Sequence, residues 1–107
     1  MQELADQARA LGKILQQRRL SVVTAESCTG GGIARLITDE PGSSAWFERG
    51  FVTYSNLSKE QMLGVPRHLI ETNGAVSEAV VLAMARGALL HSNGDVSVSV
   101  SGVAGPD

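Results

Sequence analysis

One stretch, from Val22 to Arg35, constrains the fold of this chain more than any other. It opens with a short apolar run that is rich in β-branched residues, and it then passes through small polar residues into three consecutive glycines at positions 30–32. Apolar side chains return at helical spacing in Ile33, Ala34, Leu36 and Ile37. The stretch therefore predicts a strand, a tight turn and a helix.

The predicted turn is the place where chemistry is expected. Ligands of open α/β sheets bind at the carboxyl ends of strands, where helices begin and present unpaired backbone N–H groups. Ser27, Cys28 and Thr29 occupy that position, and Gly30 and Gly31 allow a close approach of the backbone to a ligand. Glycines are also common at any sharp turn, so a purely conformational interpretation stays open. The stretch is neither a P-loop nor a dinucleotide fingerprint, because it lacks the Gly-Lys-Ser/Thr ending and the third spaced glycine.

The remaining periodicities predict a single α/β domain over residues 1–107. Five helices are predicted: near residues 2–18, from the glycines to before Pro41, from the Ser55-Asn56 cap to Gly64, over 66–72 and over 77–92. Three strands are predicted over 21–26, 48–55 and 95–101. The first strand is apolar on both faces, which indicates that helices cover it on both sides. The only tryptophan, Trp46, is interpreted as a core anchor rather than a stacking platform for a ligand.

Composition excludes several classes of function. A formal net charge of −2 without a basic cluster gives no reason to expect nucleic acid or an anionic membrane as a partner. No apolar run approaches the ~20 residues of a membrane span. The single cysteine cannot form an internal disulfide, which fits a cytoplasmic location. His68 has no Cys or His at metal-ligand spacing, so no metal site is expected.

Lys59 is the candidate base. Ser58-Lys59-Glu60-Gln61 has the form of a capping box, which predicts that Lys59 lies in the first turn of a short helix. A cation is disfavoured at that helix end, and desolvation in a cleft acts in the same direction, so the pKa of Lys59 is expected to be lowered. A neutral amine is what a general base requires. The alternative is an ordinary exposed surface lysine.

The final segment, from Asp95 to Ser101, alternates valine and serine and predicts a strand. We expect this strand to be central in the sheet and covered by helices. It continues into a glycine-rich loop from Gly102 to Asp107, where the sequence ends. An ending within a loop suggests that further elements of the domain are missing.

Four motifs, taken together, resemble the CinA C-terminal family. They are Ala25–Gly31, Gly50–Asn56 with Lys59, Gly74–Ser77 and Ser101–Asp107. The resemblance implies a three-layer α/β/α sandwich with a mixed sheet, here without the family's C-terminal elements. It also implies a nicotinamide-nucleotide amidohydrolase that converts nicotinamide mononucleotide to nicotinate mononucleotide and ammonia. No cofactor is expected, and the expected assembly is a homo-oligomer, a dimer.

The resemblance implies Ser27, Lys59 and Tyr54 as catalytic residues, in a Ser-Lys acyl-enzyme mechanism. The backbone N–H groups from Cys28 to Gly31 would bind either the oxyanion or the 5′-phosphate, and residues 27–35 do not decide between them. The substrate is also expected to contact Cys28, Thr29, Gly30, Gly31, Ser55, Gly102 and Gly105. Cys28 is a rival nucleophile, because a thiol is intrinsically more nucleophilic than a hydroxyl.

Two other classes compete with the enzyme. A non-catalytic nucleotide-binding module would use the same glycine turn but would not need Lys59 or Tyr54. A structural or competence/damage-related domain would need neither Lys59 nor Tyr54, and its glycines would serve only the backbone conformation. Ammonia release separates the first class from the others, and a ligand-dependent thermal shift separates the last two.

Overall fold

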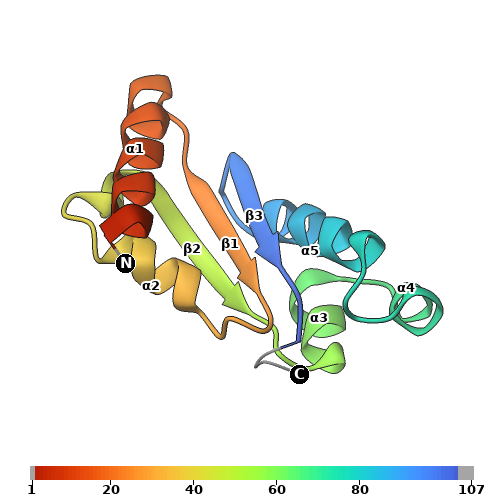
Figure 1. The fold of residues 1–107 in the computed structure, drawn as a ribbon. Coiled ribbons are helices and arrows are strands. Elements are labelled where there is room, and N and C mark those ends of the chain that lie inside the picture. The colour runs from red at the N-terminus through yellow and green to blue at the C-terminus, as the bar shows by residue number, and fades with distance from the viewer. Residues whose placement is uncertain (1, 104–107) are drawn as a thin grey trace.

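The computed structural model describes residues 2–103, which fold into helices on both sides of a small sheet (Figure 1). The elements are α1 (Gln2–Arg18), β1 (Val22–Glu26), α2 (Gly32–Thr38), a short 3-10 helix η1 (Ser43–Ala45), β2 (Phe47–Val52), α3 (Asn56–Leu63), α4 (Arg67–Asn73), α5 (Glu78–Leu90) and β3 (Val96–Val100). Every helix and strand predicted from the sequence is present, with ends that differ by a few residues.

The three strands are parallel and lie in the order β2-β1-β3. The expectation of a mixed sheet is therefore wrong for residues 2–103. A helical crossover joins each strand to the next, and this returns the chain to the same end of the sheet before the new strand begins. The two crossovers lead to opposite sides of β1, so β1 is central. The expectation that β3 is central is also wrong, since β3 is an edge strand in the described part of the chain.

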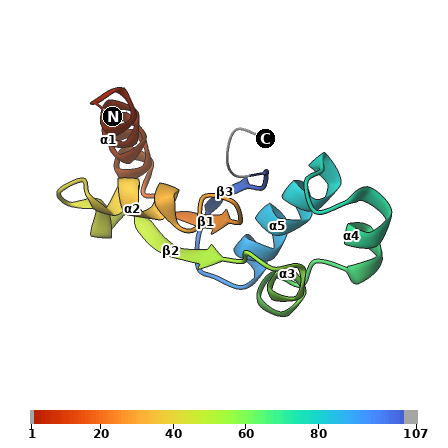
Figure 2. The ribbon, with the colours of Figure 1, turned by 60° about the horizontal axis from the view of Figure 1, so that its bottom comes forward.

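Each face of β1 packs against a different group of helices (Figure 2). Val22 contributes to one core cluster with Leu15 of α1, Ile37 of α2 and Trp46. Val23 and Ala25 point to the other side, where the cluster is completed by Leu63, Val65, Ile70, Val80, Met84 and Ala88. The arrangement is a three-layer α/β/α sandwich, and the interpretation of Trp46 as a core anchor is confirmed.

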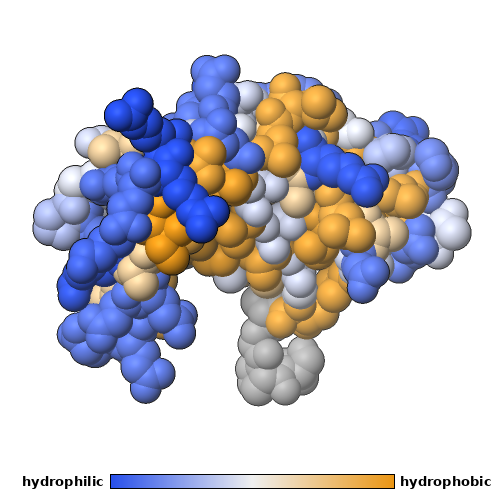
Figure 3. Space-filling model, turned by 90° about the horizontal axis from the view of Figure 1, so that it is seen from above, coloured by the Kyte–Doolittle hydropathy of each residue, from blue (hydrophilic) through white to orange (hydrophobic). Residues whose placement is uncertain are grey.

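Strand β3 turns its serines, not its valines, toward a helix. The Ser97 and Ser99 hydroxyls donate to the carbonyls of Ala85 and Val81 in α5, at 3.0 and 2.8 Å. The valines face the layer of α1 and α2, and Val98 is 39% exposed there. Figure 3 shows apolar side chains at the surface beside the hydrophilic outer face of α1.

Candidate active site

The carboxyl ends of the three strands meet at one edge of the sheet, because the strands are parallel. Ser27 directly follows β1, Tyr54 follows β2, and Gly102 follows β3. Lys59 reaches the same edge from α3. A pocket of about 340 Å³ opens there and is lined by Ser27, Cys28, Tyr54, Asn56, Lys59, Ala75, Val76, Ser101, Gly102 and Val103.

Ser27 and Lys59 are in direct contact. The Lys59 Nζ lies 3.1 Å from the Ser27 Oγ, and only 1% of Lys59 and 6% of Ser27 is exposed. The alternative of an ordinary surface lysine is therefore wrong. The helix α3 is capped by Ser55, which confirms the predicted Ser55-Asn56 cap, and not by Ser58 of the capping-box pattern, so Lys59 is the fourth residue of the helix. The Ser55 hydroxyl accepts from the Ser58 N–H at 3.0 Å, so Ser55 holds the helix and does not line the pocket.

Two backbone carbonyls orient the lysine. The Nζ donates to the carbonyl of Thr53 at 3.0 Å and to that of Tyr54 at 3.2 Å. A neutral amine has two N–H groups and one lone pair. In the structure the Nζ also donates to the Ser27 Oγ, as an ammonium does. Once the amine is neutral, its two N–H groups stay on the carbonyls and its lone pair is left for the Ser27 hydroxyl to donate to. The arrangement suits an amine that accepts the serine proton.

Burial changes the pKa of the Lys59 amine. Desolvation lowers the pKa of Lys59 from its usual 10.5, and the charge interaction with Cys28 acts in the opposite direction. The predicted direction of the pKa shift is confirmed. Its cause is mainly burial.

Tyr54 contacts Lys59 through its backbone and not through its side chain. Its side chain lines the pocket but is 70% exposed, and its hydroxyl makes no hydrogen bond to the residues that the structure describes. The contact with Lys59 is made by the Tyr54 carbonyl. The catalytic role that the resemblance implies for Tyr54 therefore stays a prediction.

Cys28 lies in the same pocket as Ser27 and is partly buried. A Cβ added at Gly102 would lie 3.3 Å from the Cys28 Sγ, so the two loops are in close contact at this point. Within the described chain the thiol has no hydrogen-bond partner, whereas the Ser27 hydroxyl contacts the amine. This geometry favours Ser27 over Cys28 as the nucleophile.

The glycine turn is built around Glu26, a residue that sequence reasoning missed. Glu26 is 1% exposed, and its carboxylate accepts from the Thr29 hydroxyl and from the N–H groups of Ile33 and Ala34, the latter two at 2.8 and 2.9 Å. The expectation that the start of α2 offers its N–H groups to a ligand is wrong, because the carboxylate occupies them. The sequence offered one signal for Glu26, which is its position directly before Ser27 in the first motif.

Only some of the other residues predicted to contact substrate line the pocket. Thr29, Gly30 and Gly31 belong to the turn but do not line the pocket, and Gly30 and Gly31 have left-handed φ angles of 59° and 98° that glycine tolerates without strain. Gly102 does line the pocket, and Gly105 lies outside the described residues. The sequence missed Asn56, Ala75, Val76, Ser101 and Val103 as lining residues, although each lies in or beside one of the four motifs.

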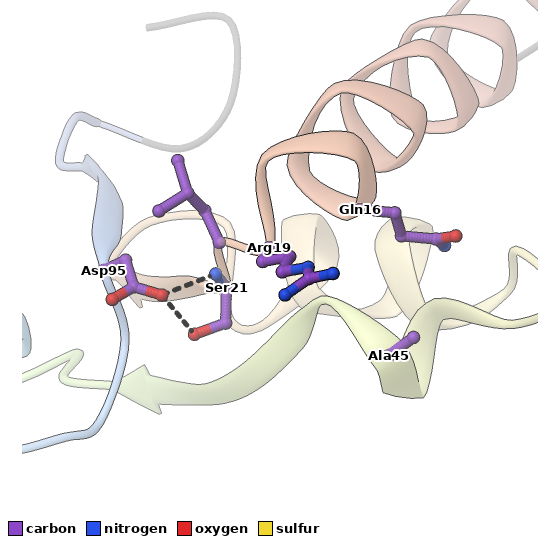
Figure 4. Close-up of a pocket in the computed structure, with 6 residues that line it drawn as sticks. Gln16, Arg19, Ser21, Ala45 and Asp95 are labelled. Carbon is purple, nitrogen blue, oxygen red and sulfur yellow. Dashed lines mark hydrogen bonds between the residues drawn. The ribbon is translucent and has the colours of Figure 1, made fainter.

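A second hollow, of about 470 Å³, lies at the opposite end of the strands (Figure 4). There Asp95 accepts from the Ser21 N–H at 2.9 Å and from its hydroxyl at 3.3 Å. Figure 4 shows Arg19 between this pair and Gln16, above Ala45. The Ser21–Asp95 contact joins the start of β1 to the start of β3, and its role is structural.

Within residues 2–103 no group of three or more His, Cys, Asp or Glu side chains is placed to hold a metal ion. None of the helices there is long and apolar enough to cross a membrane.

The fold and the pocket define an α/β protein with a buried serine–lysine pair at the carboxyl edge of a parallel sheet. Residues 4–107 match the model of the CinA C-terminal domain, and the chain belongs to that family. It is 56% identical to nicotinamide-nucleotide amidohydrolase PncC of Escherichia coli K12, over 98% of this chain and 64% of that protein. It is also 56% identical to the protein of the same name from Pseudomonas putida, over its whole length and 67% of that relative.

A solved structure has the same fold. The competence/damage inducible protein CihA from Agrobacterium tumefaciens superimposes with a TM-score of 0.94 at 47% identity, over 97% of this chain and 63% of that one. The chain thus spans just under two thirds of the length of the first of these relatives and of this structure.

Proposed function

We propose that this protein hydrolyses the carboxamide of nicotinamide mononucleotide to nicotinate mononucleotide and ammonia. The observation that carries the proposal is the 3.1 Å contact between the Ser27 Oγ and a buried lysine amine. Relatives that are 56% identical carry the name nicotinamide-nucleotide amidohydrolase, which supports this substrate class. A nucleotide-binding module or a structural domain has no use for a desolvated amine beside a hydroxyl.

The reaction follows the logic of Ser-Lys hydrolases. Neutral Lys59 takes the Ser27 proton as the Oγ attacks the carboxamide carbon, and the carbonyl oxygen becomes an oxyanion. When the C–N bond breaks, the ammonium of Lys59 returns a proton to the leaving nitrogen, which departs as ammonia. The resulting ester is cleaved by water, whose proton passes to Lys59 and then back to Ser27.

We propose that the N–H groups of Cys28 and Thr29 bind the oxyanion. They are the corner groups of a turn closed by the Gly30 N–H to the Ser27 carbonyl at 3.1 Å, and neither has a hydrogen-bond acceptor among the described residues. The alternative role, binding of a 5′-phosphate at the start of α2, is disfavoured because the Glu26 carboxylate occupies that place and would repel a second anion.

Two wider expectations remain proposals. A cytoplasmic location fits the single cysteine and the reducing conditions it suggests. A homodimer is expected from the family resemblance.

Paired substitutions in the full chain test the proposal. Ser27→Ala is expected to lower ammonia release from nicotinamide mononucleotide by about 10³-fold or more, because the acyl-enzyme cannot form. Cys28→Ala is the matched control and should keep most of the activity, with both variants folded by circular dichroism. The opposite ranking would assign the nucleophile to Cys28, and a wild-type protein without ammonia release would refute the proposed reaction.

A further inference from the structure

Glu26 is a buried carboxylate for which the proposed reaction has so far no use. It ends β1, directly before Ser27, and only 1% of it is exposed. Burial of a charge is costly unless hydrogen bonds compensate for it. Here one hydroxyl and two backbone N–H groups do so.

These contacts enclose the turn that carries the nucleophile. On one side the carboxylate holds Thr29, and on the other it holds Ile33 and Ala34 at the start of α2. At the entrance of the turn the Ser27 N–H donates to the Val100 carbonyl at 3.0 Å, which attaches the nucleophile to β3. The N–H groups of Cys28 and Thr29, which have no acceptor within residues 2–103, lie between these fixed points.

Capping of α2 alone does not explain such a residue. In α3 and α5 an exposed or half-buried serine, Ser55 or Ser77, caps the helix from the N-cap position. In α2 the N-cap is Gly31, without a side-chain cap, and the carboxylate comes from the end of a central strand instead. Only an acceptor in that place contacts the turn residue Thr29 and the helix at the same time.

We propose that Glu26 is a positioning residue that fixes the Cys28 and Thr29 N–H groups in the geometry of an oxyanion hole. The inference rests on the proposed function. Donors that are already aimed at the developing charge need no reorganisation during the reaction, which is the source of their effect on rate. Glu26 touches neither substrate nor reacting atoms and acts through the backbone of the turn.

Glu26→Gln is the sharpest test, because the amide has the shape of the carboxylate but places an NH₂ group against one of its N–H donors. The full-length variant should lose about 10- to 100-fold in kcat for amide hydrolysis, less than the loss of a whole oxyanion donor, with KM nearly unchanged. The thioamide analogue of the substrate depends less on an oxyanion hole, so its turnover should fall less than that of the amide. The acidic limb of the pH profile should stay in place, since Lys59 is untouched.

Asp95→Asn is the matched control, because it also replaces a carboxylate that holds backbone, but at the far end of β1 and β3. It should not change the amide-to-thioamide ratio. If Glu26→Gln fails to fold, Thr29→Val serves as the second variant. It removes one of the three contacts to Glu26, and it should give a smaller loss of kcat in the same direction.

Hydrogen exchange at Gly30 and Gly32, whose N–H groups close the turn on the carbonyls of Ser27 and Thr29, makes the positioning role testable apart from turnover. Exchange there should be faster in Glu26→Gln than in wild type and unchanged in Asp95→Asn. If the wild type releases no ammonia, the proposed function and the oxyanion role fall together, whereas the exchange data still decide whether Glu26 holds the turn. Equal loss of amide and thioamide turnover, or unchanged exchange, would overturn the inference.

Discussion

Lys59 is the residue at which fold and chemistry meet. Its amine is buried among Ser27 and the carbonyls of Thr53 and Tyr54, and desolvation lowers its pKa from 10.5. The folded protein therefore holds this proton less tightly than the unfolded chain does. The contribution of Lys59 to the free energy of unfolding should rise with pH between the lowered pKa and 10.5, because the unfolded chain binds more protons in that window.

The pH dependence of activity has the matching sign. As pH falls through the lowered pKa, Lys59 becomes protonated and kcat should fall. Lys59→Arg should lose about 10²- to 10⁴-fold in kcat at every pH, because a guanidinium stays protonated and cannot act as a base. Steady-state kinetics over a range of pH measure both effects, and Lys59→Met should abolish the extra pH dependence of stability in denaturant titrations. Substantial turnover by Lys59→Arg would exclude the lysine as the base.

Sequence reasoning singled out Ser27 and Lys59, which the structure brings into contact, but not the groups that place them. A serine at a strand–turn–helix junction and a lysine early in a helix are recognisable from local pattern. The acceptors of the lysine are backbone carbonyls, which every residue has, so the sequence offers no signal for them. Glu26 was missed because its partners depend on how α2 returns across the end of β1.

At the scale of elements, the site depends on how closely α5 packs against α3. A Cβ added at Gly87 of α5 would lie 2.0 Å from the Leu63 carbonyl oxygen, at the end of the helix that carries Lys59. A second tight crossing lies far from the site, where a Cβ at Gly12 of α1 would lie 2.5 Å from the Trp46 ring. Both contacts are too short for any real side chain, so a substitution must move one element.

Gly87→Ala and Gly12→Ala form a matched pair. Each should lower the free energy of unfolding by about 1–3 kcal/mol through overpacking. Only Gly87→Ala displaces α3, so it should also lower kcat in the fraction that remains folded, whereas Gly12→Ala should keep wild-type kcat. Denaturant titration combined with active-site-normalised kinetics separates the two effects. A Gly87→Ala variant of normal kcat would show that α3 tolerates the shift.

The elements were predictable because each has a local cause. The αL glycine at position 64 ends α3, and the serine caps at positions 55 and 77 begin α3 and α5. The order and direction of the strands have no such local signal, since they follow from which side of β1 each crossover takes. For the same reason the alternation in β3 predicted a strand but not that its serines would face α5.

At the scale of the whole molecule, β3 is an edge strand of the described chain with little protection against pairing. It has a neighbour on one side only, β1, and carries no charge or proline that would discourage pairing with another strand. Its valine face is partly uncovered, with Val98 39% exposed beside α1. Nearby, Tyr54 and Val103 are largely exposed at the pocket, so the space in front of the buried serine–lysine pair is open to water.

A polypeptide of residues 1–107 alone should therefore associate at micromolar concentration through β3 and release little ammonia, since water in an open pocket weakens its electrostatic interactions. Val98→Lys places a charge on this strand and should shift the polypeptide toward monomer. Leu90→Lys, at an apolar position of α5 that is 82% exposed, is the control and should not. Light scattering after size-exclusion chromatography measures the assembly, paired with the ammonia assay. A wild-type 107-residue monomer with full turnover would show that neither the β3 edge nor the open pocket matters.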